Sequence, residues 1–265
     1  MKKTTILFLI ACLSLATKAT DIRLADPTVF CHDGVYYLTG TGEVDGGFTL
    51  YTSEDLVHWT PKAGLAADGR LLHNSQSFGS STFWAPQIFR VKDSSSFGLA
   101  YAADEKIAIA YADDPHGPFK QEEIGAIDPN SSMIDPFYFV DDNGKQYLYY
   151  VRVDGSNSIY VADLSDNRQS LSNAKQCVSA AYGTWQNVTN GYAVAEGPTV
   201  FKDGDYYYLV YSCNDYRNIN YAVGYAYATS PKGAAVTFVE VKSNKGVMIF
   251  IKKLFSKNLE TSNHG

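Results

Sequence analysis

The 265-residue chain contains 45% hydrophobic and 19% charged residues, a balance typical of a globular protein with a substantial core. Its formal net charge of -6 argues against a nucleic-acid partner, which requires a basic surface, but leaves neutral ligands open. Aromatic residues are abundant, with 20 Tyr and 14 Phe, and this composition favours strands over helices.

The first 19 residues are typical of a secretory signal peptide. A short basic segment (residues 1–3) precedes an apolar run (residues 6–15) that is too short to span a bilayer as a helix, and small residues follow at Ala16 and Ala19. The alternative is a lipobox ending at Cys12, whose side chain would then be acylated. The signal peptide predicts a secreted or periplasmic protein, whereas the lipobox predicts a lipoprotein anchored through Cys12. No other segment is long and apolar enough to cross a membrane.

Four stretches of the mature chain resemble one another. Each contains a proline, a short apolar strand, a polar turn and a strand rich in aromatic residues. The turns include Asp-Gly and Asn-Gly pairs, which are strong hairpin signals between apolar runs. The prolines recur roughly every 50 to 60 residues, at Pro27, Pro86, Pro136 and Pro198.

Each stretch continues into a further strand and turn, at residues 48–51, 107–111, 158–161 and 223–227. About four strands in a unit of this length predict the blades of a β-propeller. A β-sandwich would also contain many strands, but would not show this internal similarity. The WD and kelch signatures of other propellers are not present, which disfavours a pure scaffold. We therefore predict an all-β fold with about four recognisable blades.

Acidic residues recur where the repeats begin. Asp26 and Asp135 directly precede the repeat proline, Ala85 takes this position in the second unit, and Glu196 lies one residue earlier in the fourth. The first strand of a propeller blade lines the central channel, so equivalent positions face the same end of it. Three converging carboxylates cannot all ionise freely, because burial and like charge raise at least one pKa. A protonated acid beside ionised partners is the arrangement that glycoside hydrolysis requires.

These acids also have structural interpretations. Asp-Pro is a common turn pair, and Asp128-Pro129 shows that it occurs here outside the repeat position. A buried Glu can bond backbone amides, and three carboxylates could hold calcium, although no loop of the chain has a calcium signature. The position that the acids share within the repeats favours the catalytic interpretation.

The cysteines beyond the leader are three in number, which does not suit a disulfide framework. They have no regular spacing, and no Cys or His pair has the spacing of a zinc site. We predict small buried hydrophobic residues, with one disulfide bridge as the alternative, at Cys31, Cys177 and Cys213.

At these repeats the sequence resembles glycoside hydrolase family 43. The matching motifs are Ala25-Asp26-Pro27, Phe83-Trp84-Ala85-Pro86, Ile134-Asp135-Pro136 and Glu196-Gly197-Pro198. The resemblance implies a five-bladed propeller and an inverting enzyme that acts on α-L-arabinofuranosides, arabinan or β-xylosides, with no cofactor required. It also implies that Asp26 is the general base and Glu196 the general acid, and that Asp135 orients the acid and tunes its pKa.

The resemblance also suggests contacts to the substrate. Trp84, with the adjacent Phe83, lies where the family often places an aromatic residue near the sugar, and a flat ring stacks well on a sugar's C–H face. A core position is the alternative for an aromatic residue this close to the start of a strand. Arg217 is a candidate for a hydrogen bond to a sugar hydroxyl.

The last part of the chain departs from the family pattern. Four units are recognisable where the family has five, and residues 241–265 are rich in lysine and lack the turn-and-aromatic pattern. We therefore expect a signal peptide (1–19), a shortened propeller (20–240) and an atypical tail (241–265).

The leading hypothesis is an exported inverting glycosidase acting on arabinose- or xylose-containing polysaccharides or oligosaccharides of plant cell walls. The alternative is a carbohydrate-binding propeller that no longer catalyses. The preference for arabinose or xylose, exo or endo cleavage, and a structural calcium stay open at this point.

Overall fold

The computed structural model describes residues 22–42, 44–233 and 237–240. The predicted signal peptide, the alternative lipid site at Cys12 and the atypical tail (241–265) lie outside these residues. The described part is all-β apart from two short 3₁₀ helices, η1 (Ala67–Gly69) and η2 (Asn74–Gln76). Its strands are β1 (Ala25–His32), β2 (Val35–Thr41), β3 (Gly47–Thr49), β4 (Tyr51–Ser53), β5 (Arg70–His73), β6 (Trp84–Arg90), β7 (Phe97–Ala103), β8 (Lys106–Ala112), β9 (Met133–Val140), β10 (Gln146–Val153), β11 (Asn157–Leu164), β12 (Leu171–Ser179), β13 (Ala195–Asp203), β14 (Tyr206–Cys213), β15 (Ala222–Ala228) and β16 (Thr237–Glu240).

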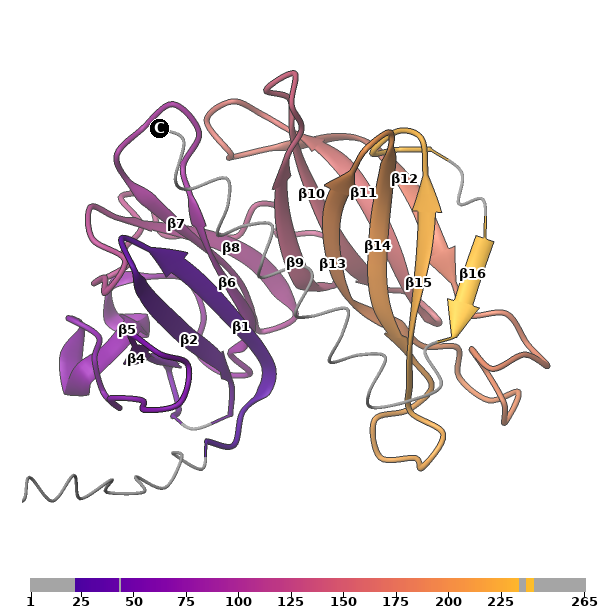
Figure 1. Ribbon diagram of the computed structural model, residues 1–265, viewed down its shortest axis with the longest axis horizontal. Helices are drawn as coiled ribbons and strands as arrows, with labels where there is room; N and C mark the ends of the chain where they lie inside the picture. Colours follow the sequence, from indigo (N-terminus) through magenta and orange to yellow (C-terminus); the bar gives the residue numbers. More distant parts are fainter. Residues whose placement is uncertain (1–21, 43, 234–236, 241–265) are drawn as a thin grey trace, which may run out of the picture.

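The strands form antiparallel meanders that correspond to the four predicted repeats (Figure 1). Blade one contains β1, β2 and β4, blade two contains β6 to β8, blade three contains β9 to β12, and blade four contains β13 to β16. Strands β3 and β5 pair separately beside blade one. The prediction of an all-β propeller with four recognisable blades is therefore confirmed.

Blades one and two have three strands in their sheets, fewer than the four predicted. In blade one the chain turns away after β4, because Asp55 accepts hydrogen bonds from the backbone N–H groups of Val57 and His58, both at 2.8 Å. In blade two, Pro115 lacks an N–H group for a further ladder, and Asp114 accepts from the N–H of His116 at 2.8 Å. The outer edges of the two blades are reduced to single bridges, Thr52 to Thr60 and Tyr111 to Lys120.

Separate hydrophobic clusters seal each junction between neighbouring blades. Phe48 and Tyr101 belong to the cluster between blades one and two, and Tyr211 to the cluster between blades three and four. Between blades two and three, the rings of Phe89 and Tyr138 stack with their centroids 4.0 Å apart. Burial of such aromatic side chains dominates the energetics of the core, so the junctions hold the inner strands in fixed positions.

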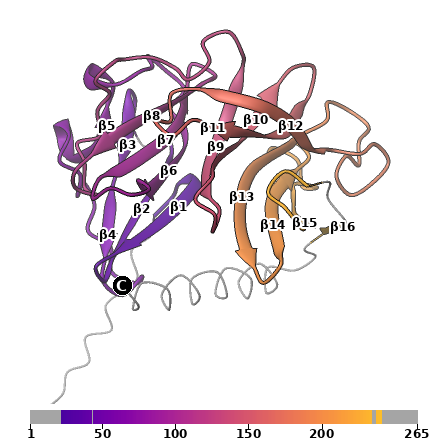
Figure 2. The same ribbon diagram turned by 90° about the horizontal axis from the view of Figure 1, so that it is seen from above.

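The inner strands β1, β6, β9 and β13 each occupy one edge of their sheet, and they pack against one another in chain order (Figures 1 and 2). Between β6 and β9, the side chain of Gln87 accepts a hydrogen bond from the N–H of Tyr138 at 2.6 Å and donates to its carbonyl at 3.2 Å. The side chain of Gln87 thus makes the two hydrogen bonds that the backbone of a neighbouring strand would otherwise make. It links the first strands of blades two and three.

Each inner strand carries a β-bulge at its repeat proline. The register shifts between Ala25 and Thr28, and at the corresponding points of β6, β9 and β13. Proline has no N–H group to donate to the ladder, so it is tolerated at such a bulge. A bulge bends the strand and redirects side chains, and it is common beside active sites.

Candidate active site

The residue before each repeat proline has the same unusual backbone conformation. Asp26, Ala85 and Asp135 have φ values of 46°, 44° and 53°, and Gly197 has 61°. This left-handed region is costly for most residues and is tolerated best by Gly, Asn and Asp. In blade four Gly takes the left-handed position, so the carboxylate comes from the preceding residue, Glu196, whose side chain is one methylene longer than that of Asp.

Asp135 is half-buried, and its carboxyl faces charges from two other blades. Burial raises its pKa to about 7, and the negative charges of Asp26 and Glu196 add to this, while the N–H of Gly197 opposes it. That N–H donates to Oδ2 of Asp135 at 2.9 Å. Asp135 therefore holds the backbone next to Glu196, and it binds a proton far more readily than a free aspartate.

Glu196 is half-buried between blade three and the β14–β15 loop. The hydroxyl of Tyr221 donates to Oε1 at 2.9 Å, and Nδ2 of Asn157 donates to Oε2 at 3.4 Å. Burial raises the pKa of Glu196; the two hydrogen bonds oppose this rise, and the charges of Asp26 and Asp215 add to it. The net effect is a raised pKa, as a proton donor near neutral pH requires.

Asp26 is the exposed member of the three acids. The hydroxyl of Thr41 donates to its Oδ2 at 2.7 Å, and the same hydroxyl accepts from the N–H of Ala85 at 2.9 Å. Thr41 thus connects the acid of blade one to the start of blade two. The charge of Asp26 raises the pKa of both Asp135 and Glu196, so the three carboxyl groups of blades one, three and four form one electrostatic unit.

The two aromatic residues that were expected near the sugar, Phe83 and Trp84, lie in different environments in the structure. Phe83 is 6% exposed and packs in the core, with its ring 5.7 Å from that of Phe48 and 6.0 Å from that of Tyr101. The prediction that Phe83 contacts substrate is therefore wrong, because its ring is enclosed by core residues. Trp84 is half-buried and starts β6, in the position that Glu196 takes in blade four, so it lies at the same end of the inner strands.

Arg217 lies on the loop between β14 and β15, with its side chain 73% exposed. It forms an ion pair with Asp215 at 2.5 Å, and its guanidinium lies over the ring of Tyr216. Hydrogen bonds from the side chain and backbone of Arg217 lower the pKa of Asp215 to about 2. Arg217 therefore pairs with Asp215, whose charge adds to the raised pKa of Glu196, and its role in binding sugar stays a prediction.

Sequence reasoning did not identify Thr41, Asn157 or Tyr221 as site residues. They reach the carboxylates from the end of β2, the start of β11 and the loop before β15. None belongs to a local motif. Their place in the repeat could have indicated them, because each lies near a strand end that the antiparallel meander brings close to a repeat proline.

A family model described as glycosyl hydrolases family 43 matches residues 20–246. The chain belongs to this family. Among curated proteins it is 26% identical over 218 residues to the extracellular exo-α-(1→5)-L-arabinofuranosidase ArbA of Cellvibrio japonicus, covering 75% of this chain and 61% of the relative. It is 25% identical over 230 residues to the β-D-galactofuranosidase xynD of Aspergillus niger, covering 79% and 62%. The chain thus spans about three-fifths of the length of these relatives.

Solved structures of family 43 enzymes share the fold. A structure from Bacteroides thetaiotaomicron described as an endo-1,4-β-xylanase has a TM-score of 0.73 and 37% identity, covering 83% of this chain and 73% of its own. A thermostable family-43 glycoside hydrolase has a TM-score of 0.72 and 29% identity, covering 86% and 76%. These similarities extend across the four blades described above.

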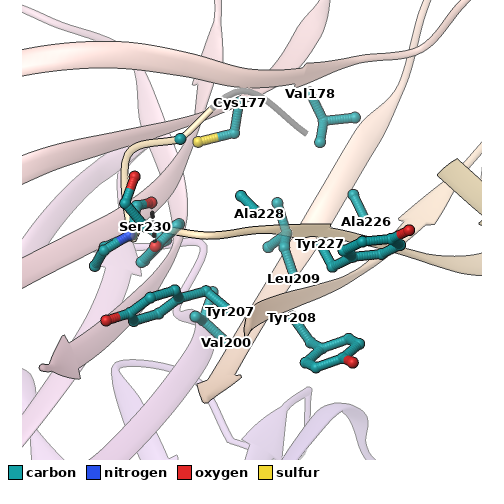
Figure 3. Close-up of a pocket in the computed structure, with 13 residues that line it drawn as sticks. Cys177, Val178, Val200, Tyr207, Tyr208, Leu209, Ala226, Tyr227, Ala228 and Ser230 are labelled. Atoms are coloured by element: carbon teal, nitrogen blue, oxygen red, sulfur yellow. Dashed lines mark hydrogen bonds between the residues drawn. The ribbon is translucent and has the colours of Figure 1, made fainter. Parts of the chain in front are cut away.

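The three described cysteines are free thiols; Cys213 is buried, as predicted, whereas Cys31 and Cys177 are half-buried. Cys177 lines a cavity of about 30 Å³ between blades three and four, together with Tyr207, Leu209 and Ala228 (Figure 3). Burial raises the pKa of the Cys177 thiol to about 12, which keeps it protonated and unreactive. This cavity is a packing gap away from the acids.

Within residues 22–42, 44–233 and 237–240, no group of three His, Cys, Asp or Glu side chains is arranged to hold a metal ion. In the same part of the chain, no helix is long and apolar enough to cross a membrane.

Proposed function

We propose that the chain is an exported inverting glycoside hydrolase that cleaves α-L-arabinofuranosyl or β-D-xylosyl linkages in plant cell-wall polysaccharides or oligosaccharides. The observation that carries this proposal is the set of three carboxyl groups, Asp26, Asp135 and Glu196. They come from three blades, and the negative charge of Asp26 raises the pKa of both Asp135 and Glu196. Such a set can contain both a protonated carboxyl group and an ionised one, and glycoside hydrolysis needs one of each as proton donor and proton acceptor.

Asp26 is the general base in this mechanism. It is exposed to water and held by Thr41, so an ionised carboxylate can accept a proton from a water molecule that attacks the anomeric carbon. The bond from that carbon to the glycosidic oxygen breaks, and the leaving oxygen takes a proton from Glu196. Attack on one face and departure from the other invert the anomeric configuration.

Asp135 supports the general acid without transferring a proton to substrate. It accepts the N–H of Gly197, which fixes the backbone that carries Glu196. Its own raised pKa limits the negative charge in the site before substrate binds.

The choice of sugar rests on the relatives. The described functions of similar proteins include an exo-arabinofuranosidase, a xylosidase/arabinosidase and a galactofuranosidase. Export is supported by the extracellular relative in Cellvibrio japonicus and by the leader-like first 19 residues.

The test is hydrolysis of aryl α-L-arabinofuranoside and aryl β-D-xyloside by the mature chain. Asp26→Asn should abolish turnover, whereas Asp33→Asn, which changes an exposed aspartate of similar backbone conformation at the far end of β1, should not. NMR of the first-formed sugar reports its anomeric configuration. A folded chain that turns over neither substrate but binds the oligosaccharides in calorimetry would favour the carbohydrate-binding alternative.

A further inference from the structure

The general acid assigned above is held by two side chains, Asn157 and Tyr221, that no sequence motif indicated. We propose that Tyr221 is a positioning residue that binds Oε1 of Glu196, leaving Oε2 as the oxygen that carries the proton to the leaving group. This inference rests on the proposed function, because it concerns how the same site delivers a proton.

The contacts of the two carboxyl oxygens are unequal. Tyr221 donates to Oε1 at 2.9 Å, an ordinary hydrogen bond, whereas Asn157 lies 3.4 Å from Oε2, at the long limit for one. A protonated carboxyl has one carbonyl oxygen that accepts and one hydroxyl that donates. A phenol that donates to Oε1 makes this oxygen the acceptor, so the acidic hydrogen belongs on Oε2.

Asn157 is oriented as a hydrogen-bond donor to Oε2, and the oxygen of a hydroxyl group at Oε2 can still accept this long contact. The hydroxyl of Tyr192 donates to Oδ1 of Asn157 at 3.2 Å, so the amide nitrogen points to Glu196. The N–H of Asn157 donates to the carbonyl of Ala193 at 2.9 Å, which fixes the start of β11 against the loop that leads into β13.

Tyr221 is held in place by the loop that carries it. The side chain of Asn214, 6% exposed, donates to the carbonyls of Asn220 and Trp185 at 2.9 and 2.8 Å and accepts from the N–H of Val188 at 3.1 Å. These hydrogen bonds fix the loop, and therefore the position of the Tyr221 phenol. It is still 39% exposed, so it lies at the mouth of the site, where a leaving group would depart.

Tyr221 acts on the charge as well as on the geometry of Glu196. Burial and the charge of Glu196 raise the pKa of the phenol, which stays a donor throughout the working range of the enzyme. Its hydrogen bond favours the carboxylate that remains after proton transfer, and so strengthens the acid. The other ionisable groups that influence or are influenced by Glu196 are Asp26, Asp135, Cys213 and Asp215, the last paired with Arg217.

Tyr221→Phe tests the proposal by two independent readouts. In the first, kcat/KM is measured against pH for aryl glycosides with good and poor leaving groups. The basic limb should move up by about one pH unit. The poor leaving groups should lose roughly tenfold in rate, while an activated dinitrophenyl group, which needs little protonation, should lose much less. In the second, the pKa of Glu196 is followed by carboxyl carbon NMR, with the resonance assigned from Glu196→Gln, and it should rise.

The matched control is Tyr206→Phe, at the other end of β14, where the tyrosine has a similar exposed fraction of 43%. It should change neither readout. Equal losses for all leaving groups, or an unchanged NMR pKa, would show that Tyr221 is merely structural and would overturn the inference. If the wild-type chain turns over no glycoside but the NMR pKa still moves, the proposed function fails while the hydrogen-bond assignment stands.

Discussion

Neutralising Asp135 should stabilise the fold while it impairs the site. Asp135→Asn keeps an oxygen that accepts the N–H of Gly197, but removes the ionisable group. The carboxyl has a pKa of about 7 in the fold against 3.8 for a free aspartate, because it is buried and faces two other acids. At 1.36 kcal/mol per pKa unit, its ionisation in the fold costs roughly 4 kcal/mol.

The raised pKa of Asp135 makes the stability difference between wild type and Asp135→Asn depend on pH. Below about pH 3 the carboxyl is mostly protonated in the folded and unfolded chains, so wild type and variant should unfold alike. As the pH rises from 4 to 7, the unfolded wild-type chain ionises while the folded one resists, and the wild type loses stability. Above pH 7 the advantage of Asp135→Asn should be constant at roughly 4 kcal/mol, or about 10 °C in melting temperature.

Urea unfolding at pH 4, 5.5, 7 and 8.5, followed by tryptophan fluorescence, measures this advantage. Asp33→Asn is the control, since Asp33 has a comparable φ of 49° but its side chain is 87% exposed. A difference between wild type and Asp135→Asn that does not change with pH, or that favours the wild type above pH 7, would refute the assignment of a buried, proton-binding carboxyl. Turnover of aryl arabinofuranoside by the variant should fall, because the proposed function requires the carboxyl group of Asp135 beside the backbone that carries Glu196.

Other changes test the supports of the site. Thr41→Val removes the hydroxyl that Asp26 and the N–H of Ala85 share, and should cost about 1–3 kcal/mol in urea unfolding and lower kcat; unchanged values would show that this link is dispensable. Gly197→Ala meets no atom within 4 Å, so its cost should be the left-handed backbone alone, about 1–2 kcal/mol by thermal unfolding. A much larger loss would contradict the open space at this position. The Cys177 thiol should resist a maleimide at pH 8 until urea unfolds the chain, and fast labelling of the native protein would contradict its burial.

The inner strands and their acids could be predicted because the sequence repeats them. A carboxylate one or two residues before a proline recurs in units one, three and four, and the shared bulge places Asp26, Asp135 and Glu196 at one end of the blades. The supporting residues could not be predicted in this way. Tyr221 and Asn157 come from a loop and a third strand, and their approach to Glu196 depends on how two blades pack.

The error at Phe83 has a simple physical origin. Adjacent residues on extended chain point in opposite directions, so Phe83 and Trp84 could not both face a sugar. The number of strands was overestimated in blades one and two for a different reason. A polar side chain there ends the ladder by bonding the backbone, as Asp55 does after β4, and hydrophobic periodicity does not report such a cap.

Because of the bulge at the repeat proline, the residues just before that proline determine whether a blade contributes a carboxylate to the site. Each inner strand presents a ready-made left-handed position, occupied by Asp26, Ala85, Asp135 and Gly197. The backbone at Ala85 already has the shape that carries an aspartate in two other blades. A single substitution at this position of a blade can therefore add or remove a carboxylate while the backbone of the strand keeps its shape.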